Sequence, residues 1–131
     1  MHPYGRRLII ATPTCSDHIK KIEDEFDLVN EQNSLCAVYT VLYEGWNAYL
    51  AVFNMNHLQS ITYGMVAHES NHLVDFTMDT IGQTIDPNNN EVSAYLTEWV
   101  VNTMFKHFED RDLLKMLSTE TKIREKDGES N

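Results

Sequence analysis

The sequence predicts one α+β domain in which a small antiparallel sheet, built on a β-hairpin, packs against long helices. Three observations indicate this class. The chain has 131 residues, 42% of them hydrophobic, which is enough for one core of two layers. Residues 35–53 are rich in β-branched and aromatic residues around one turn signal. From residue 56 onwards, apolar residues recur at helical intervals.

The first third of the chain predicts a short strand followed by an amphipathic helix. Residues 6–11 are mostly apolar and end at a Thr-Pro pair, which indicates a strand. Ser16 or Asp17 can cap a helix over residues 18–29, because the apolar residues there fall on one face.

The next segment predicts the hairpin. Residues 35–43 form the first arm, which is almost wholly apolar and is therefore expected to be buried on both faces. Residues 44–47 supply the turn and residues 48–53 the second arm. If the second arm is an edge strand, its free backbone groups can bind an extended peptide by strand addition.

Two long helices and a short one complete the domain. The first long helix covers about residues 56–82 and ends at Gly82. The second covers about residues 91–108, and a short helix follows Asp110. We expect the domain to span residues 1–118, with residues 119–131 as a flexible charged tail.

Charge and processing signals exclude several classes of protein. Ten Lys and Arg against 20 Asp and Glu give a net charge of −10, which argues against nucleic-acid partners and against anionic membranes. No apolar run reaches the roughly 18 residues of a membrane span, and the one after Arg7 is too short for a signal peptide. Cys15 and Cys36 form no metal-type pair. We therefore expect a cytoplasmic protein.

The first long helix contains the pentapeptide His68-Glu69-Ser70-Asn71-His72, an H-E-x-x-H motif. Residues four apart share one face of a helix, so both imidazoles can bind one cation, for which zinc is the usual choice. Glu69 follows the first ligand and can accept a proton from a water that the metal activates. The motif predicts a zinc site that performs hydrolysis.

A catalytic zinc ion usually has three protein ligands, so the third must come from elsewhere in the chain. Glu91 begins the next helix, 19 positions after His72, and is the leading candidate. Glu98 lies seven residues further on nearly the same face and is the alternative. Asp79 could reach the metal only if its own helix bends.

The motif, followed by Asn90-Glu91-Val92-Ser93-Ala94-Tyr95, resembles the gluzincin branch of zinc metallopeptidases over about residues 65–102. It also resembles small phage-encoded proteins that carry an H-E-x-x-H motif and, less closely, ImmA/IrrE-type regulatory peptidases. The resemblance implies a zincin-like fold with His68, His72 and Glu91 as zinc ligands and Glu69 as general base. The sequence departs from many gluzincins in having Tyr95 where they place Asp, and no downstream oxyanion motif is present.

Two supporting residues are suggested by helical spacing. Asp75 shares the face of the two histidines and is our candidate for orienting one of them. Tyr95 lies one turn after Glu91 and is our candidate for the oxyanion donor, ahead of Tyr63 and His107.

The sequence therefore predicts a zinc-dependent peptidase that acts on polypeptides, with Glu69 as the general base. The alternative is a zincin-like protein of weak or no activity that binds a metal or a partner peptide. A metal-free helical interaction protein is a third hypothesis.

Overall fold

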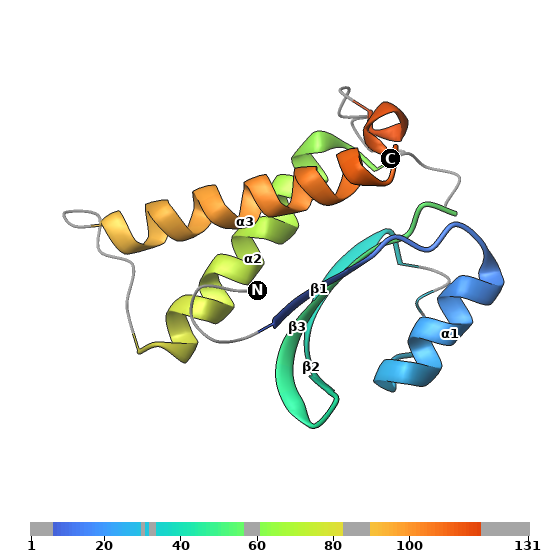
Figure 1. The fold of residues 1–131 in the computed structure, drawn as a ribbon, viewed down its shortest axis with the longest axis horizontal. Helices are drawn as coiled ribbons and strands as arrows, with labels where there is room; N and C mark the ends of the chain where they lie inside the picture. Colours follow the sequence, from blue (N-terminus) through green and yellow to red (C-terminus); the bar gives the residue numbers. More distant parts are fainter. Residues whose placement is uncertain (1–6, 30, 32–33, 57–60, 83–89, 119–131) are drawn as a thin grey trace, which may run out of the picture.

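The computed structural model describes residues 7–29, 31, 34–56, 61–82 and 90–118. The element order is β1 (Arg7–Ala11), α1 (Ser16–Phe26), β2 (Cys36–Tyr43), β3 (Trp46–Phe53), α2 (Tyr63–Thr80), α3 (Glu91–Asp110) and a short 3₁₀ helix, η2 (Leu114–Met116). Helix α1 lies on one side of the sheet, and α2 and α3 lie on the other (Figure 1). The expected α+β class and element order are confirmed. The expected tail, residues 119–131, lies outside the described residues.

The sheet has three strands in the order β1-β3-β2, so β3 is central. Strands β2 and β3 form the expected antiparallel hairpin, closed by Glu44 and Gly45. Both turn residues have positive φ, 52° and 83°, as a two-residue hairpin turn of type I′ requires. Strand β1 pairs in parallel with β3, from Arg7 opposite Ala48 to Ala11 opposite Val52. The sheet is therefore mixed, whereas the sequence predicted an antiparallel one.

The burial of the two hairpin arms is the reverse of the prediction. Residues 48–53 of β3 are all buried, because β1 and β2 flank this strand and helices cover it. Strand β2 lies at the edge of the sheet and is only half-buried, with Leu42 70% exposed. The prediction that the second arm could be an edge strand was wrong, and the free edge beside α2 belongs to β2.

Helix α1 is shorter than predicted at its C-terminal end. It ends at Phe26 because Asp27 adopts a left-handed conformation and Leu28 N–H donates to the carbonyl of Glu23, as in a Schellman cap. Cys15 occupies the N-cap position without a side-chain cap bond, so the prediction that Ser16 or Asp17 caps this helix was wrong.

Helix α2 begins seven residues later than predicted. Ser118 N–H donates to the Ile61 carbonyl at 2.9 Å, and Tyr63 N–H donates to the Ser118 carbonyl at 3.1 Å. This pairing holds the backbone before the helix extended. Thr62 then caps α2 by accepting from Met65 N–H at 3.0 Å. At the other end Gly82 has φ of 72°, consistent with the predicted stop.

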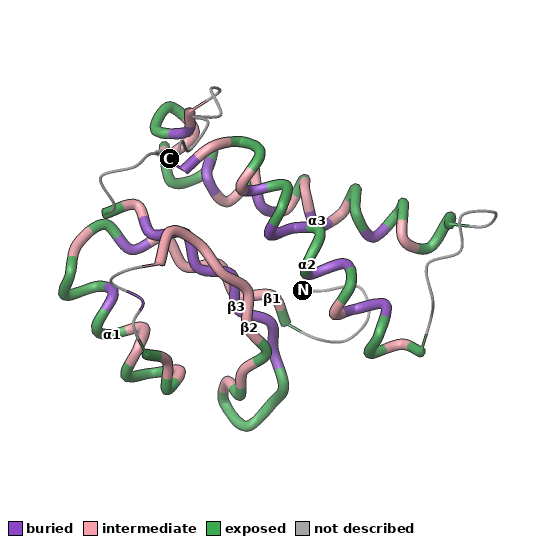
Figure 2. Tube along the Cα trace, turned by 180° about the vertical axis from the view of Figure 1, so that it is seen from behind, coloured by how far each residue is buried: buried purple, intermediate pink, exposed green. Residues whose placement is uncertain are grey.

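The core lies between the sheet and the two long helices (Figure 2). Phe53 of β3 meets Phe108 of α3 edge to face, with ring centroids 5.3 Å apart. The buried apolar residues of α2 and α3 fall on one stripe of each helix: Val66, Leu73, Val74, Met78, Leu96, Val100, Met104 and Phe108. Among the helices of the described residues, none has the length and apolarity needed to cross a membrane.

The pH dependence of stability is expected to include a contribution from His107. Its Nε2 atom lies 3.2 Å from the Thr12 hydroxyl, and burial followed by the nearby Arg111 lowers its pKa from 6.5 to about 4. The unfolded chain therefore binds more protons between these values, so folding stability should fall as pH drops from about 6.5 to about 4. The free energy of unfolding, measured with urea across this range, should change less with pH for His107→Gln than for wild type. His18→Gln, at an exposed position of α1, is the control, and identical profiles for all three proteins would contradict the assignment.

Candidate metal centre

The two motif histidines converge on the exposed face of α2. Their Nε2 atoms are 3.1 Å apart, and their ring planes are 85° apart. Two nitrogens that bind the same tetrahedral zinc ion, each at about 2.0–2.1 Å, lie about 3.3 Å from each other. His68 and His72 therefore fit a shared divalent cation, as the helical spacing predicted.

The burial of the opposite face of α2 explains this orientation. Val66 and Leu73 are fully buried, and Ser70 is buried with its hydroxyl donating to the Val66 carbonyl at 2.8 Å. The Ser70 hydroxyl thus has its hydrogen-bond partner within the helix, and the two histidines are directed outward.

Glu69 has a different environment from the histidines on either side of it. It is 6% exposed, and its Oε2 atom accepts a hydrogen bond from the Cys36 thiol at 3.4 Å. Cys36 is the first residue of β2, so the edge strand holds the carboxylate of the predicted general base. Sequence spacing gives no signal for this contact, because only the packing of β2 beside α2 brings the two residues together.

A second buried carboxylate lies near Glu69. Glu31 is 4% exposed and accepts a hydrogen bond from the Tyr39 hydroxyl, and its Oε1 atom has no hydrogen-bond partner within the described ranges. Burial, together with the charges of Glu31 and Glu69, raises the pKa of Tyr39 above its usual range. The phenol therefore remains a donor. The Asn54 side chain holds the backbone at Glu31 in place by donating to the Glu31 carbonyl at 3.2 Å.

The structure does not bring Glu91 to the histidine pair. No group of three or more His, Cys, Asp and Glu side chains able to hold a metal is present in residues 7–29, 31, 34–56, 61–82 and 90–118. Tyr63 at the start of α2 packs on Phe105, at 5.6 Å between ring centroids. Glu91 lies 14 residues before Phe105, about 21 Å along α3. The ligand roles of Glu91 and of its alternative Glu98 stay predictions.

The predicted supporting residues form no hydrogen bond with the histidine pair within the described residues. Tyr95 is 67% exposed on α3, in the turn after Glu91. Asp75 is exposed and makes no hydrogen bond to either histidine within the described chain. Tyr63 and His107 are held by the contacts with Phe105 and Thr12 given above. The roles of Tyr95 and Asp75 stay predictions.

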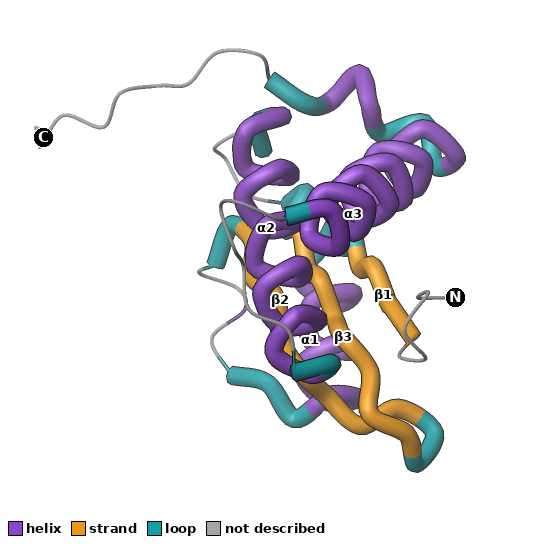
Figure 3. The backbone as a smooth tube through the Cα atoms, turned by 90° about the vertical axis from the view of Figure 1, so that its left-hand side faces the viewer, coloured by secondary structure: helices purple, strands orange, loops and turns teal. Residues whose placement is uncertain are grey.

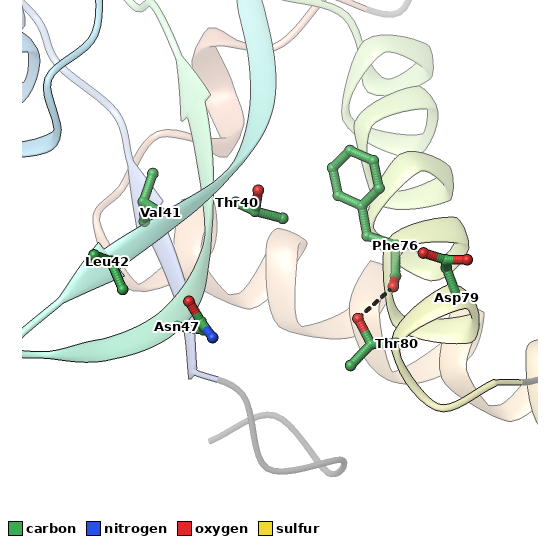
Figure 4. Close-up of a pocket in the computed structure, with 7 residues that line it drawn as sticks. All are labelled: Thr40, Val41, Leu42, Asn47, Phe76, Asp79 and Thr80. Carbon is green, nitrogen blue, oxygen red and sulfur yellow. Dashed lines mark hydrogen bonds between the residues drawn. The ribbon is translucent and has the colours of Figure 1, made fainter.

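A hollow of about 380 Å³ lies between the hairpin and the C-terminal part of α2 (Figure 4). The hairpin contributes one wall: Thr40, Val41, Leu42 and Asn47. Phe76, Asp79 and Thr80 of α2 form the other. Below them the Tyr49 hydroxyl is bonded to the Thr80 hydroxyl at 2.8 Å. Asp79, which was considered as a third metal ligand, lines this hollow and forms no metal-binding group with the histidines.

Comparisons of the chain with protein-family models, with curated proteins and with solved structures found no match. The resemblance to gluzincins therefore depends on the motif residues alone.

Zinc should stabilise the folded protein through the histidine pair. A ligand that binds only the folded state raises the midpoint temperature of unfolding. We therefore expect added zinc to raise this temperature in wild type, and His68→Gln or His72→Gln to abolish the rise. Both positions are exposed, so both variants should fold. His18→Gln should respond to zinc as wild type does. Retention of the zinc effect in both motif variants would rule out this site.

The third ligand can be identified by measuring zinc affinity directly. Glu91→Ala should weaken zinc binding by at least about tenfold, because a charged ligand is lost, whereas Glu98→Ala should leave the affinity unchanged. Unchanged affinity in Glu91→Ala would remove Glu91 from the ligand set, and a loss confined to Glu98→Ala would assign the role to Glu98.

Proposed function

We propose that this protein is a zinc-dependent peptidase of the zincin-like, gluzincin type. The observation that supports this most strongly is the 3.1 Å separation of the His68 and His72 Nε2 atoms on an exposed helix face. The buried carboxylate of Glu69 lies between them in sequence. This combination supplies two metal ligands and a base on adjacent positions of one helix.

Each group has a distinct task in the proposed reaction. His68 and His72 hold zinc, and Glu91 is our candidate for the third ligand. Bound zinc would polarise the peptide carbonyl and make a water molecule more acidic. Glu69 accepts the proton of the attacking water and delivers it to the leaving amine. Cys36 restricts the carboxylate by donating to Oε2, so Glu69 is a base of defined position.

The edge strand β2 supports a polypeptide as the substrate. It borders α2, and among the described strands it has a neighbour only on the β3 side (Figure 3). An extended peptide can pair with the free backbone groups of such an edge and pass the histidine face. Pairing of this kind would hold the scissile bond without a second domain. The net charge of −10 favours neutral or basic polypeptides.

A binding protein without peptidase activity is the second candidate. It is favoured by the fact that, in the part of the chain that the structure describes, no third ligand joins the two converging histidines. A site of this kind would hold metal or a partner peptide without completing the catalytic set. Zinc binding without hydrolysis would distinguish this function from the first.

Cleavage of an unstructured protein by the zinc-loaded chain should depend on Glu69. Glu69→Gln removes the proton acceptor, and general-base catalysis contributes about 10²–10⁴-fold, so the rate should fall at least about 100-fold. Zinc affinity should be retained, because Glu69 is not a ligand. Glu25→Gln, at an exposed position of α1, is the matched control and should cleave normally. Equal rates for Glu69→Gln and wild type would exclude this mechanism.

A further inference from the structure

We propose that the hollow between the hairpin and α2 is a subsite for a lysine or arginine side chain of a bound polypeptide. The placement of this lysine or arginine about three residues from the cleaved bond rests on the proposed peptidase function. The recognition of a basic side chain depends only on the lining of the hollow.

The lining suits a long apolar side chain that ends in a cation. Leu42 and the Phe76 ring offer apolar contact for the methylene groups. Asp79 is the one charged side chain among the lining residues that the structure describes. None of the ion pairs within the described residues includes it, so its carboxylate can accept hydrogen bonds from an incoming ammonium or guanidinium group.

The polar groups around Asp79 support a donor-rich ligand. The side chains of Thr40 and Asn47 line the hairpin wall and can accept hydrogen bonds through their oxygens. The Thr80 hydroxyl already donates to the Phe76 carbonyl at 2.9 Å, and Tyr49 bonds it from below. The α2 wall therefore keeps its shape, and none of the described lining side chains carries a positive charge that would repel the ligand.

The geometry of α2 sets the distance from the metal site. Asp79 is seven residues after His72 on nearly the same face, which corresponds to about 10 Å along the helix. Three residues of an extended peptide cover about the same length. Strand β2 follows α2 in the same direction, since Cys36 contacts Glu69 and the far end of the strand borders the hollow. A peptide along this edge therefore passes both sites.

The test measures peptide binding to the zinc-loaded Glu69→Gln protein, so that the peptide is not consumed. A fluorescent ten-residue peptide without other charges carries one lysine, placed at each position in turn, and the same peptide with glutamine is the reference. One lysine position should raise the affinity about tenfold in fluorescence anisotropy, the gain expected of a charge-assisted hydrogen bond. Adding Asp79→Asn should abolish the gain. Adding Asp24→Asn, which removes the same charge from α1, should preserve it.

Charge reversal provides a second variant. Asp79→Lys in the same protein should transfer the preference to a peptide with glutamate at that position. Equal binding of all peptides, no measurable binding, or equal losses in Asp79→Asn and Asp24→Asn would overturn the subsite. Failure of the peptidase proposal has a separate signature: lysine-dependent binding, lost in Asp79→Asn, by a protein whose wild-type form cleaves nothing. Cleavage without any preference for lysine would overturn the subsite alone.

Discussion

The packing of α2 against the central strand determines where the α2 groups of the candidate site lie. Tyr49 of β3 is fully buried, and its hydroxyl is 2.8 Å from the Thr80 hydroxyl and 3.4 Å from the Phe76 carbonyl. A buried hydroxyl that loses its partners is costly, so this contact fixes the rotation of α2 about its axis. With that rotation His68 and His72 face outward, and Glu69 faces the edge strand.

Two carboxylates are buried where apolar residues would give a more stable protein. Glu69 has a thiol as its hydrogen-bond donor, and a thiol is a weak donor. Glu31 is bonded by Tyr39 through one oxygen, while its other oxygen is unsatisfied within the described residues. Such groups lower the free energy of unfolding, so they are expected where function requires them. The surrounding hairpin and core supply the burial that offsets this cost.

Local sequence patterns predicted most of the helices and strands. They could not predict how segments far apart in the chain pair with one another. The four-residue spacing of His68 and His72 was sufficient to predict their convergence, because helix geometry alone determines it. The strand order was not predictable in this way, since β1 pairs with residues 41 positions later in the chain. The offset between α2 and α3 depends on tertiary contacts such as Tyr63 with Phe105, so spacing alone could not place Glu91 relative to the motif.

The mixed sheet has a consequence for the order of folding. Partners within the β2–β3 hairpin are 3 to 17 residues apart, whereas every β1–β3 pair is 41 residues apart. Closing the longer loop costs more chain entropy, so we expect the hairpin to form first and β1 to dock later. The histidine pair, Cys36, Glu69 and the hollow all belong to residues 36–80. These groups, unlike the candidate ligand Glu91 on α3, are thus encoded in one continuous segment that can assemble before either end of the chain is in place.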